Sequence, residues 1–326
     1  MITVWFCLVV LCWTLFFVLE GFDFGVGMLG PLAGRDDHER GAIVRTVGPF
    51  WDGNEVWLVA AIGVTFAAFP DWYAALLSGL YLPMVALLLL LAVRGVALEF
   101  RGKGDGERWR RRCDAALAAS SAGIVLLWGA VLGVITHGLA LGADGQVAGA
   151  GLSRSTAPLL GAPALAGAGA ALFAALLIGA MFLALRTTGP VRLRARRLSV
   201  ALSTGGAVVL GAVGLGTGSR PVLAAAVLCA GLAMLARNCA ELLAFGGTAL
   251  GIAGAVVAAF TAHGEVVLRS TLDPAWSLTM TGAAATDSAL RLLSVVGVIV
   301  LPGVLVYQAY SYWVFRRRVA SERVPS

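Results

Sequence analysis

Long apolar segments recur along the whole chain, and they constrain its fold more than any other feature of the sequence. Of the 326 residues, 59% are hydrophobic and only 13% are charged, and the mean hydropathy is +0.88. A soluble domain of this size does not bury so apolar a sequence, whereas a helix that crosses the ~30 Å hydrocarbon core of a bilayer needs about 20 such residues. The sequence therefore predicts an all-α polytopic membrane protein that forms one integral membrane domain over residues 1–326.

Charged residues, glycines and prolines divide the apolar sequence into about nine expected membrane helices. The division is weakest between residues 199 and 261, where only Arg220-Pro221 and Arg237-Asn238 interrupt a run of small and aliphatic residues. The first run follows no basic segment and carries no small-residue cleavage site, so we expect a retained helix and not a signal peptide. The expected helices cover residues 2–22, 52–69, 72–98, 115–138, 158–185, 199–217, 221–237, 239–261 and 287–315.

Basic residues are distributed unequally between the two sets of loops, and this bias sets the expected orientation. Positively charged residues concentrate on the cytoplasmic side of membrane proteins. With an external N-terminus, twenty of the 24 basic residues fall on the cytoplasmic side. We therefore expect the N-terminus outside and the C-terminus in the cytoplasm, and the net charge of +6 reflects this bias and not a nucleic-acid partner. The cytoplasmic set is Arg35, Arg40, Arg45, Arg94, Arg101, Lys103, Arg108, Arg110, Arg111, Arg112, Arg186, Arg192, Arg194, Arg196, Arg197, Arg237, Arg316, Arg317, Arg318 and Arg323; the external set is Arg154, Arg220, Arg269 and Arg291.

The segment GPFWDGNEVWL, residues 48–58, places two acids at the start of an expected membrane helix. Asp52 and Glu55 are three residues apart and therefore share one face of that helix. A charged side chain in hydrocarbon costs roughly 2.5–3.5 kcal/mol on insertion scales, so these acids require a partner, a hydrated cavity or a function. Trp51 and Trp57 flank them as aromatic anchors do at a membrane interface.

A second pair of acids, Glu20 and Asp23, has the same spacing at the end of the first expected helix. In the expected orientation both pairs lie at the cytoplasmic level of the membrane. One interpretation is a proton-accepting cluster, in which repulsion between close acids readies one of them to relay a proton near neutral pH. The other is a solvated helix end whose acids pair with nearby arginines, with Asp52 capping a helix N-terminus. The spacing alone leaves both open.

Two further patterns concern helix ends and helix packing. Glu99 and Arg101 close the third expected helix at the same cytoplasmic level, and Arg94 precedes them. Gly21 and Gly25 stand at GxxxG spacing, which predicts that another helix approaches closely there.

Side chains that could hold a metal, a haem or a nucleophile are sparse. The five cysteines form no CxxC pair, and four lie in or beside apolar segments, where cysteine acts as a small hydrophobe. His38 falls in a polar cytoplasmic loop, where we expect it to be solvated. His137 and His263 could flank one haem near the outer surface, but each lies beside a glycine at a helix end, which favours a loop role. No nucleotide-binding, nucleophile-elbow or zinc-protease motif occurs, so we expect no metal site and no catalytic constellation in this chain alone.

Seven segments, spread along the chain from residue 21 to residue 319, closely resemble subunit II of the cytochrome bd-type quinol oxidases. The most specific is GPFWDGNEVWL; the Ala/Gly-rich regions match only in hydropathy. The other six are GFDFGVGML (21–29), FAAFPDWYAALLSGLYLP (66–83), RGVALEFRGK (94–103), RTTGPVRLRARRL (186–198), STLDPAWSLTM (270–280) and LPGVLVYQAYSYWVFRRRV (301–319).

The resemblance implies a role that depends on a partner. In this family, haems b and d and the quinol-oxidising loop belong to subunit I, where O2 is reduced to water. Subunit II is a nine-helix protein, with two four-helix bundles plus one peripheral helix, that clasps subunit I in a pseudo-symmetric heterodimer in the bacterial plasma membrane. The resemblance leaves open a structurally bound quinone in this subunit and a small single-helix accessory subunit.

The resemblance also assigns roles to residues. The aspartate that matches Asp52 belongs to a proton path from the cytoplasm toward the haems, and we expect Glu55, Glu20 and Asp23 to extend that path. The remaining motif residues, expected to shape the path or the subunit interface, are Trp51, Gly53, Asn54, Trp57, Arg94, Glu99 and Arg101.

Two alternatives come from other functional classes. A proton-coupled secondary transporter would also place acids in membrane helices, but such transporters favour inverted repeats and broken helices at the membrane midplane. We find no convincing repeat, and the charges cluster at one face. A purely structural membrane scaffold is the second alternative.

Overall fold

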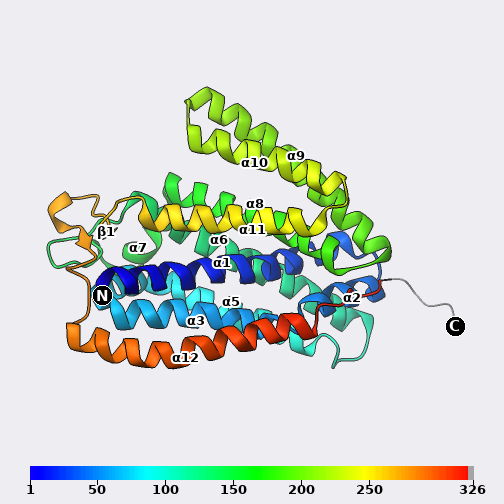
Figure 1. The fold of residues 1–326 in the computed structure, drawn as a ribbon, viewed down its shortest axis with the longest axis horizontal. Helices are drawn as coiled ribbons and strands as arrows, with labels where there is room; N and C mark the ends of the chain where they lie inside the picture. The colour runs from blue at the N-terminus through cyan, green and yellow to red at the C-terminus, as the bar shows by residue number, and fades with distance from the viewer. Residues whose placement is uncertain (322–326) are drawn as a thin grey trace.

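The computed structural model describes residues 1–321 and consists almost entirely of helices aligned along one long axis (Figure 1). Arg323, one of the expected cytoplasmic basic residues, lies outside the described residues. Within them, eight helices are long and apolar enough to cross a membrane, which confirms an all-α polytopic membrane protein. These are α1 (Ile2–Ala33), α5 (Tyr81–Phe100), α6 (Glu107–His137), α8 (Ala162–Arg186), α9 (Gly189–Thr217), α10 (Arg220–Arg237), α11 (Glu241–Thr261) and α12 (Asp287–Val314).

A further helix, α3 (Trp51–Ala68), lies between α1 and α12 and is aligned with both (Figure 1). Its 18 residues include the polar first turn with Asp52, Asn54 and Glu55, which distinguishes it from the eight more apolar helices. Short elements fill the connections: α2 (Asp37–Val47), α4 (Pro70–Tyr73), a π-helical turn η1 (Ala74–Ser78), α7 (Gly151–Thr156), the 3-10 turns η2 (Ala157–Leu160) and η3 (Pro274–Trp276), and the antiparallel strands β1 (Val266–Leu268) and β2 (Leu278–Thr279).

The long helices form two groups of four with α12 at the side. Helices α1, α3, α5 and α6 pack together, and helices α8 to α11 form the second group. The two groups meet where α8 packs against α1 and α6. Helix α12 packs against α3, and the hairpin of α9 and α10 diverges from α8 and α11 (Figure 1). This arrangement agrees with the expected two bundles and peripheral helix.

Several helices extend farther than their hydropathy indicates. Helix α1 continues to Ala33 instead of ending at residue 22, α6 begins at Glu107 instead of 115, and α9 begins at Gly189 instead of 199. Polar residues lower the hydropathy of these turns but do not interrupt the backbone hydrogen bonds of a helix. Asp23 therefore lies about 15 Å of helix before the end of α1 and not at the helix end that the sequence suggests.

Glycine allows α1 and α8 to approach each other closely at one point. A Cβ at Gly25 would overlap the carbonyl oxygen of Ala175 and the Cα of Gly179, and a Cβ at Gly179 would overlap the backbone of Gly25. A Cβ at Gly21 would meet no atom within 4 Å. The expectation of a close approach is thus correct for Gly25 and wrong for Gly21, because the contact involves one turn of α1 and not two.

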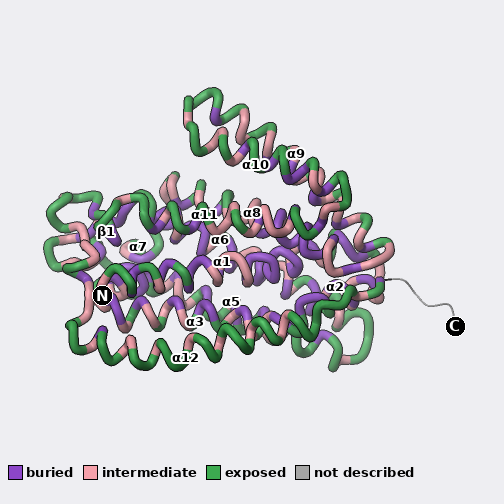
Figure 2. The backbone as a smooth tube through the Cα atoms, viewed as in Figure 1, coloured by how far each residue is buried: buried purple, intermediate pink, exposed green. Residues whose placement is uncertain are grey.

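Burial is concentrated in α1, α6 and α8, at the contact between the two groups (Figure 2). In α12 only Leu290 is buried among the described residues, and most of its apolar side chains are exposed. An apolar helix with so little burial requires either lipid or a protein partner around it.

The two glycines provide a matched pair of variants. We expect Gly25→Ala to destabilise the protein by about 1–3 kcal/mol, because overpacking forces α1 and α8 apart, whereas Gly21→Ala should leave stability nearly unchanged. Thermal unfolding of the purified membrane protein measures both. Equal midpoints for the two variants would contradict the close approach.

Candidate functional site

Three helices bring five polar residues together inside the membrane domain, and we call them the acid–arginine cluster. Glu20 and Asp23 come from α1, Asn54 and Glu55 from the first turns of α3, and Arg94 from α5. Glu20, Asp23, Asn54 and Arg94 are almost completely buried, and Glu55 is half-buried. The structure therefore joins Glu55, from one of the two acid pairs, to Glu20 and Asp23 of the other pair, and it adds Asn54 and Arg94 between them.

Arg94 is the positive charge of the cluster. Its Nη1 lies 3.4 Å from Oε2 of Glu20 and 3.8 Å from Oε2 of Glu55. The side chain of Arg94 is only 1% exposed. Its guanidinium also lies over the ring of Phe24, 4.7 Å from the centroid, and 6.0 Å from the ring of Trp51. A cation held by carboxylates and aromatic faces is the arrangement that makes a buried arginine tolerable.

Several polar atoms of the cluster have no hydrogen-bond partner among the described residues. They are Oε1 and Oε2 of Glu20, Oδ1 of Asp23, and Nε, Nη1 and Nη2 of Arg94. Unpaired buried polar atoms are costly, and polar contacts longer than about 3.5 Å are often bridged by water. These atoms of Glu20, Asp23 and Arg94 thus keep donor and acceptor capacity that water molecules beside them could use.

Asn54 links α1 to α12. Its Nδ2 donates a hydrogen bond to Oδ2 of Asp23 at 2.7 Å and makes a longer contact of 3.5 Å with the carbonyl oxygen of Leu19. Its Oδ1 accepts hydrogen bonds of 2.8 Å from Nε2 of Gln308 and from the hydroxyl of Tyr312. The sequence analysis missed Gln308 and Tyr312; their i, i+4 spacing on a mainly apolar helix was the available signal.

Asp52 lies at the surface and not inside the cluster. It is exposed, and it makes no hydrogen bond or ion pair with any described residue. Helix α3 begins at Trp51 with Phe50 as N-cap and no side-chain cap, so Asp52 does not cap the helix. Its carboxylate acts electrostatically on Glu55, one turn away. Asp52 is thus the exposed neighbour of the half-buried Glu55.

The two tryptophans of the motif have different environments. Trp51 is half-buried beside Arg94 and close to Gly95, as a residue near the membrane surface can be. Trp57 is 1% exposed and packs in the apolar core, so its expected role as an interface anchor is wrong. The helix turns Trp57 inward because it lies on the same face of α3 as the buried Asn54. Gly53 lies on α3 where it faces α12.

Arg101 belongs to a second ionic group near the end of α5. Its Nε pairs with Oδ1 of Asp114 at 2.5 Å and its Nη2 with Oδ1 of Asp37 at 2.9 Å. Arg40 and Arg110 contact the same two acids. Burial opposes the charge of Arg101, but the hydrogen bonds and charges of Asp114 and Asp37 outweigh burial and raise its pKa. This group ties α2 to α5 and α6 and has a structural character.

Four other residues of the sequence analysis lie apart from the cluster. Glu99 is exposed and pairs with Lys103 at 3.5 Å. His38 lies in helix α2 and not in a loop, and its Nδ1 is buried. His137 ends α6, and Nε2 of His263 contacts the carbonyl oxygen of Thr136 at 2.9 Å. Among residues 1–321, no three His, Cys, Asp or Glu side chains are grouped closely enough to hold a metal ion.

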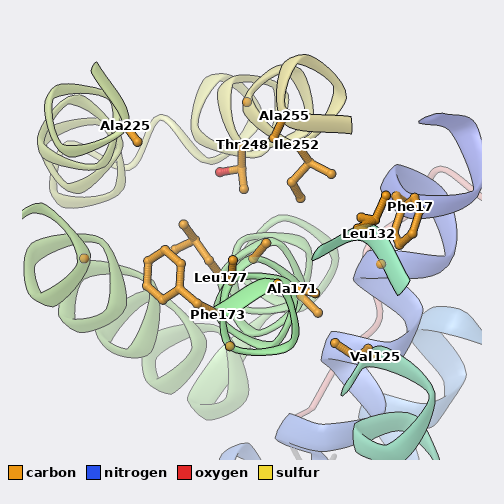
Figure 3. A pocket seen from close by; sticks show the side chains of 18 of the residues that line it. Phe17, Val125, Leu132, Ala171, Phe173, Leu177, Ala225, Thr248, Ile252 and Ala255 are labelled. Carbon is orange, nitrogen blue, oxygen red and sulfur yellow. The ribbon is translucent and has the colours of Figure 1, made fainter. Parts of the chain in front are cut away.

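A large apolar cleft of about 1390 Å³ lies elsewhere, between α8, α11 and the hairpin of α9 and α10, and it reaches α1 and α6. Figure 3 shows Phe173, Leu177, Thr248 and Ile252 around this space. The hydroxyl of Thr248 is already bonded to the carbonyl oxygen of Ala244. The acid–arginine cluster, and not this cleft, contains the ionisable side chains, so it is the better candidate for proton chemistry.

Comparisons with known proteins agree with the resemblance seen in the sequence. The family model described as cytochrome bd terminal oxidase subunit II matches residues 1–315. Cytochrome bd ubiquinol oxidase subunit 2 of Bacillus subtilis is 34% identical, with 97% of this chain and 96% of that protein covered. Cytochrome bd-I ubiquinol oxidase subunit 2 of Escherichia coli K12 is 28% identical, with 98% and 96% covered. A solved structure of bd oxidase from Geobacillus thermodenitrificans shares the fold, with a TM-score of 0.59, 18% identity and 97% of each chain covered.

The geometry predicts that Arg94 offsets the charge of the acids around it. Arg94→Met should destabilise the protein by about 3–5 kcal/mol, because it leaves buried acids without their counter-charge. The double variant Arg94→Met/Glu20→Gln should recover part of that loss, since it also removes one acid. Thermal unfolding of the purified protein gives both values. If the double variant is as unstable as the sum of the two single variants, Arg94 and Glu20 are not coupled.

Proposed function

The chain belongs to the family of cytochrome bd terminal oxidase subunit II, and from this premise we propose that it lines the route by which protons from the cytoplasm reach the site of oxygen reduction in a haem-bearing subunit I. In this proposal the complex oxidises quinol, reduces O2 to water and holds haems b and d in subunit I. The chain itself supplies the second half of the membrane domain and the acids of the route. Family membership favours this function over the transporter alternative.

The observation that carries the proposal is the acid–arginine cluster. Structural ion pairs inside a membrane protein need only balanced charge, but this cluster contains three carboxyl groups and one arginine. Ionisable groups in membrane segments mark proton or ion pathways more often than they serve packing. The excess of acids over bases is what a group that takes up and releases protons requires.

The proposed route begins at Asp52 and leads inward. Asp52 is exposed and acts on the half-buried Glu55, and Glu55 lies within 3.8 Å of Arg94. Arg94 connects to Glu20, and Asp23 lies one helical turn from Glu20 on α1. Exposure thus falls in order from Asp52 through Glu55 to the buried acids. Water molecules that bridge the unpaired atoms of Glu20, Asp23 and Arg94 would complete a chain for proton transfer.

The side of the membrane from which the protons are taken up decides whether the reaction moves charge across the membrane. Reduction of one O2 to water consumes four protons, and each charge that crosses 100 mV is worth about 2.3 kcal/mol. If these protons come from the cytoplasm while quinol releases its protons outside, charge separates without a pump. The proposed orientation, with the N-terminus outside, the C-terminus inside and α3 as a ninth span, places Asp52 at the cytoplasmic side.

The surface beside the route suits a protein partner. Val59 of α3 and Val298 and Ile299 of α12 are exposed apolar side chains on neighbouring helices. Asp52 is exposed at one end of this surface. We place subunit I against α3 and α12, where it would cover the exposed acid and receive protons. The haems then belong to subunit I, and a structural quinone or a single-helix accessory subunit remains a separate option.

Replacement of Asp52 tests the proposed route. Asp52→Asn keeps the shape of the side chain and removes its titration, so oxygen reduction by the assembled complex should slow well beyond twofold while haem content stays normal. Glu107→Gln is the matched control, because Glu107 is an exposed acid whose one ion pair among residues 1–321 is with Arg111, at 2.6 Å. Oxygen consumption and the visible spectrum provide the two readouts.

The two results that oppose the proposal differ in kind. Full turnover with full haem content would remove Asp52 from the route. A parallel loss of haem and activity would show a role in assembly only. Slow turnover in the Glu107 control would show that any lost surface acid has this effect.

A further inference from the structure

Helix α12 is mainly apolar and largely exposed, and it reaches the acid–arginine cluster through two polar side chains. Gln308 and Tyr312 are four residues apart and therefore lie on one face of the helix. Both donate to the same atom, Oδ1 of Asn54, at 2.8 Å. Asn54 on α3 is fully buried. Among the described residues of α12, only Leu290 is buried. These two hydrogen bonds thus join α12 to α3 at the level of the acid–arginine cluster, whereas Ser294, farther along α12, accepts a hydrogen bond from Trp5 of α1.

The two donors determine which way the amide of Asn54 points. The amide oxygen has two lone pairs, and Gln308 and Tyr312 use both. The amide nitrogen is then directed at Oδ2 of Asp23, to which it donates at 2.7 Å. A rotated amide would place its oxygen against the Asp23 carboxylate and its nitrogen against the amide nitrogen of Gln308. Either contact is unfavourable, so α12 fixes the orientation.

Packing holds the ring of Tyr312 independently of its hydroxyl. The ring stacks on Phe50, with centroids 4.6 Å apart and an interplanar angle of 11°. Phe50 is buried and is the N-cap of α3. Tyr312→Phe therefore removes one hydrogen-bond donor and leaves the stack in place. This separation makes the contribution of the hydroxyl measurable.

We propose that Gln308 and Tyr312 are positioning residues for proton transfer, because they orient Asn54 so that its N–H group stabilises Asp23 in the carboxylate form. The inference rests on the proposed function of the cluster and extends it to α12. Neither residue exchanges a proton in this scheme. They act through Asn54, and they make the proton affinity of Asp23 depend on where α12 lies.

Other charged groups also face Asp23, and they limit what the donors can do. Glu20 lies one turn away on the same helix, Arg94 comes from α5, and Glu55, which pairs with Arg94, comes from α3. Asp52 lies farther out, at the surface. From α12 the only titratable side chain in contact with Asn54 is Tyr312. None of these charges changes in a Gln308→Met or Tyr312→Phe variant, so an effect of either variant on pH dependence reports the lost hydrogen bond.

The test is the pH profile of quinol-dependent oxygen consumption by the assembled oxidase. A carboxylate that loses a donor holds its proton more tightly, so Gln308→Met and Tyr312→Phe should each move the profile toward higher pH by about half a unit to one unit. Haem content should remain normal. Tyr310→Phe is the control, because it removes an exposed hydroxyl from the same helix.

A second genetic background, Asn54→Ala, tests whether Tyr312 acts on Asp23 through Asn54. In an Asn54→Ala variant there is no amide to orient, so the addition of Tyr312→Phe should cause no further shift of the pH profile. A further shift of the same size as in the wild-type background would show that Tyr312 acts on Asp23 without Asn54, and would overturn the inference. An unchanged profile for both Gln308→Met and Tyr312→Phe would overturn it as well.

Asp23→Asn separates a failure of this inference from a failure of the proposed function. If Asp23→Asn slows turnover and alters the pH profile but the α12 variants do not, the proton route stands and α12 has no part in it. If Asp23→Asn also leaves turnover and pH profile unchanged, the proposed route through the cluster is wrong, and the α12 inference fails with it.

Discussion

The buried guanidinium of Arg94 is the constraint on which this structure depends. A charge that is 1% exposed inside a membrane domain is tolerated only with compensating charge and polarisable neighbours close by. Glu20, Glu55 and the faces of Phe24 and Trp51 supply them from α1 and α3. Helices α1, α3 and α5 must therefore meet at this level in one register. The same requirement keeps several acids in a place where protons can be exchanged.

In the first group of helices, the residues that hold the helices together are also the residues of the proposed proton route. The second group, α8 to α11, is held to the first by a different kind of contact. Around Arg94 the helices are joined by charges and hydrogen bonds. Between α1 and α8 they are joined by a close backbone approach at Gly25 and Gly179. Farther out, the hairpin of α9 and α10 leaves an apolar cleft against α8 and α11. The acid–arginine cluster thus lies in the group of helices that faces α12 and the proposed partner surface.

Hydropathy and charge were sufficient to predict the class of fold and to identify the two acid pairs. They predicted nine membrane helices, and eight of the described helices are long and apolar enough to cross a membrane. These criteria placed Glu20 and Asp23 at the end of a helix, whereas α1 continues to Ala33. Hydropathy falls wherever acids occur, so it cannot distinguish a helix that ends there from a helix that continues with its acids buried. The role of Trp57 was missed for a related reason, since a tryptophan beside charged residues can face either way. Gln308 and Tyr312 join the cluster through contacts between α3 and α12, which lie about 250 residues apart in sequence and which no local pattern encodes.

Infrared difference spectroscopy of the assembled oxidase, between its oxidised and reduced states, tests the central claim most directly. If the acid–arginine cluster takes up protons, the spectrum should contain the carbonyl stretch of a protonated carboxylic acid that shifts in deuterated water. That band should disappear or move in Glu20→Gln or in Asp23→Asn. A spectrum with no such band, or with a band unchanged in both variants, would contradict the account and leave the cluster as a structural ion pair.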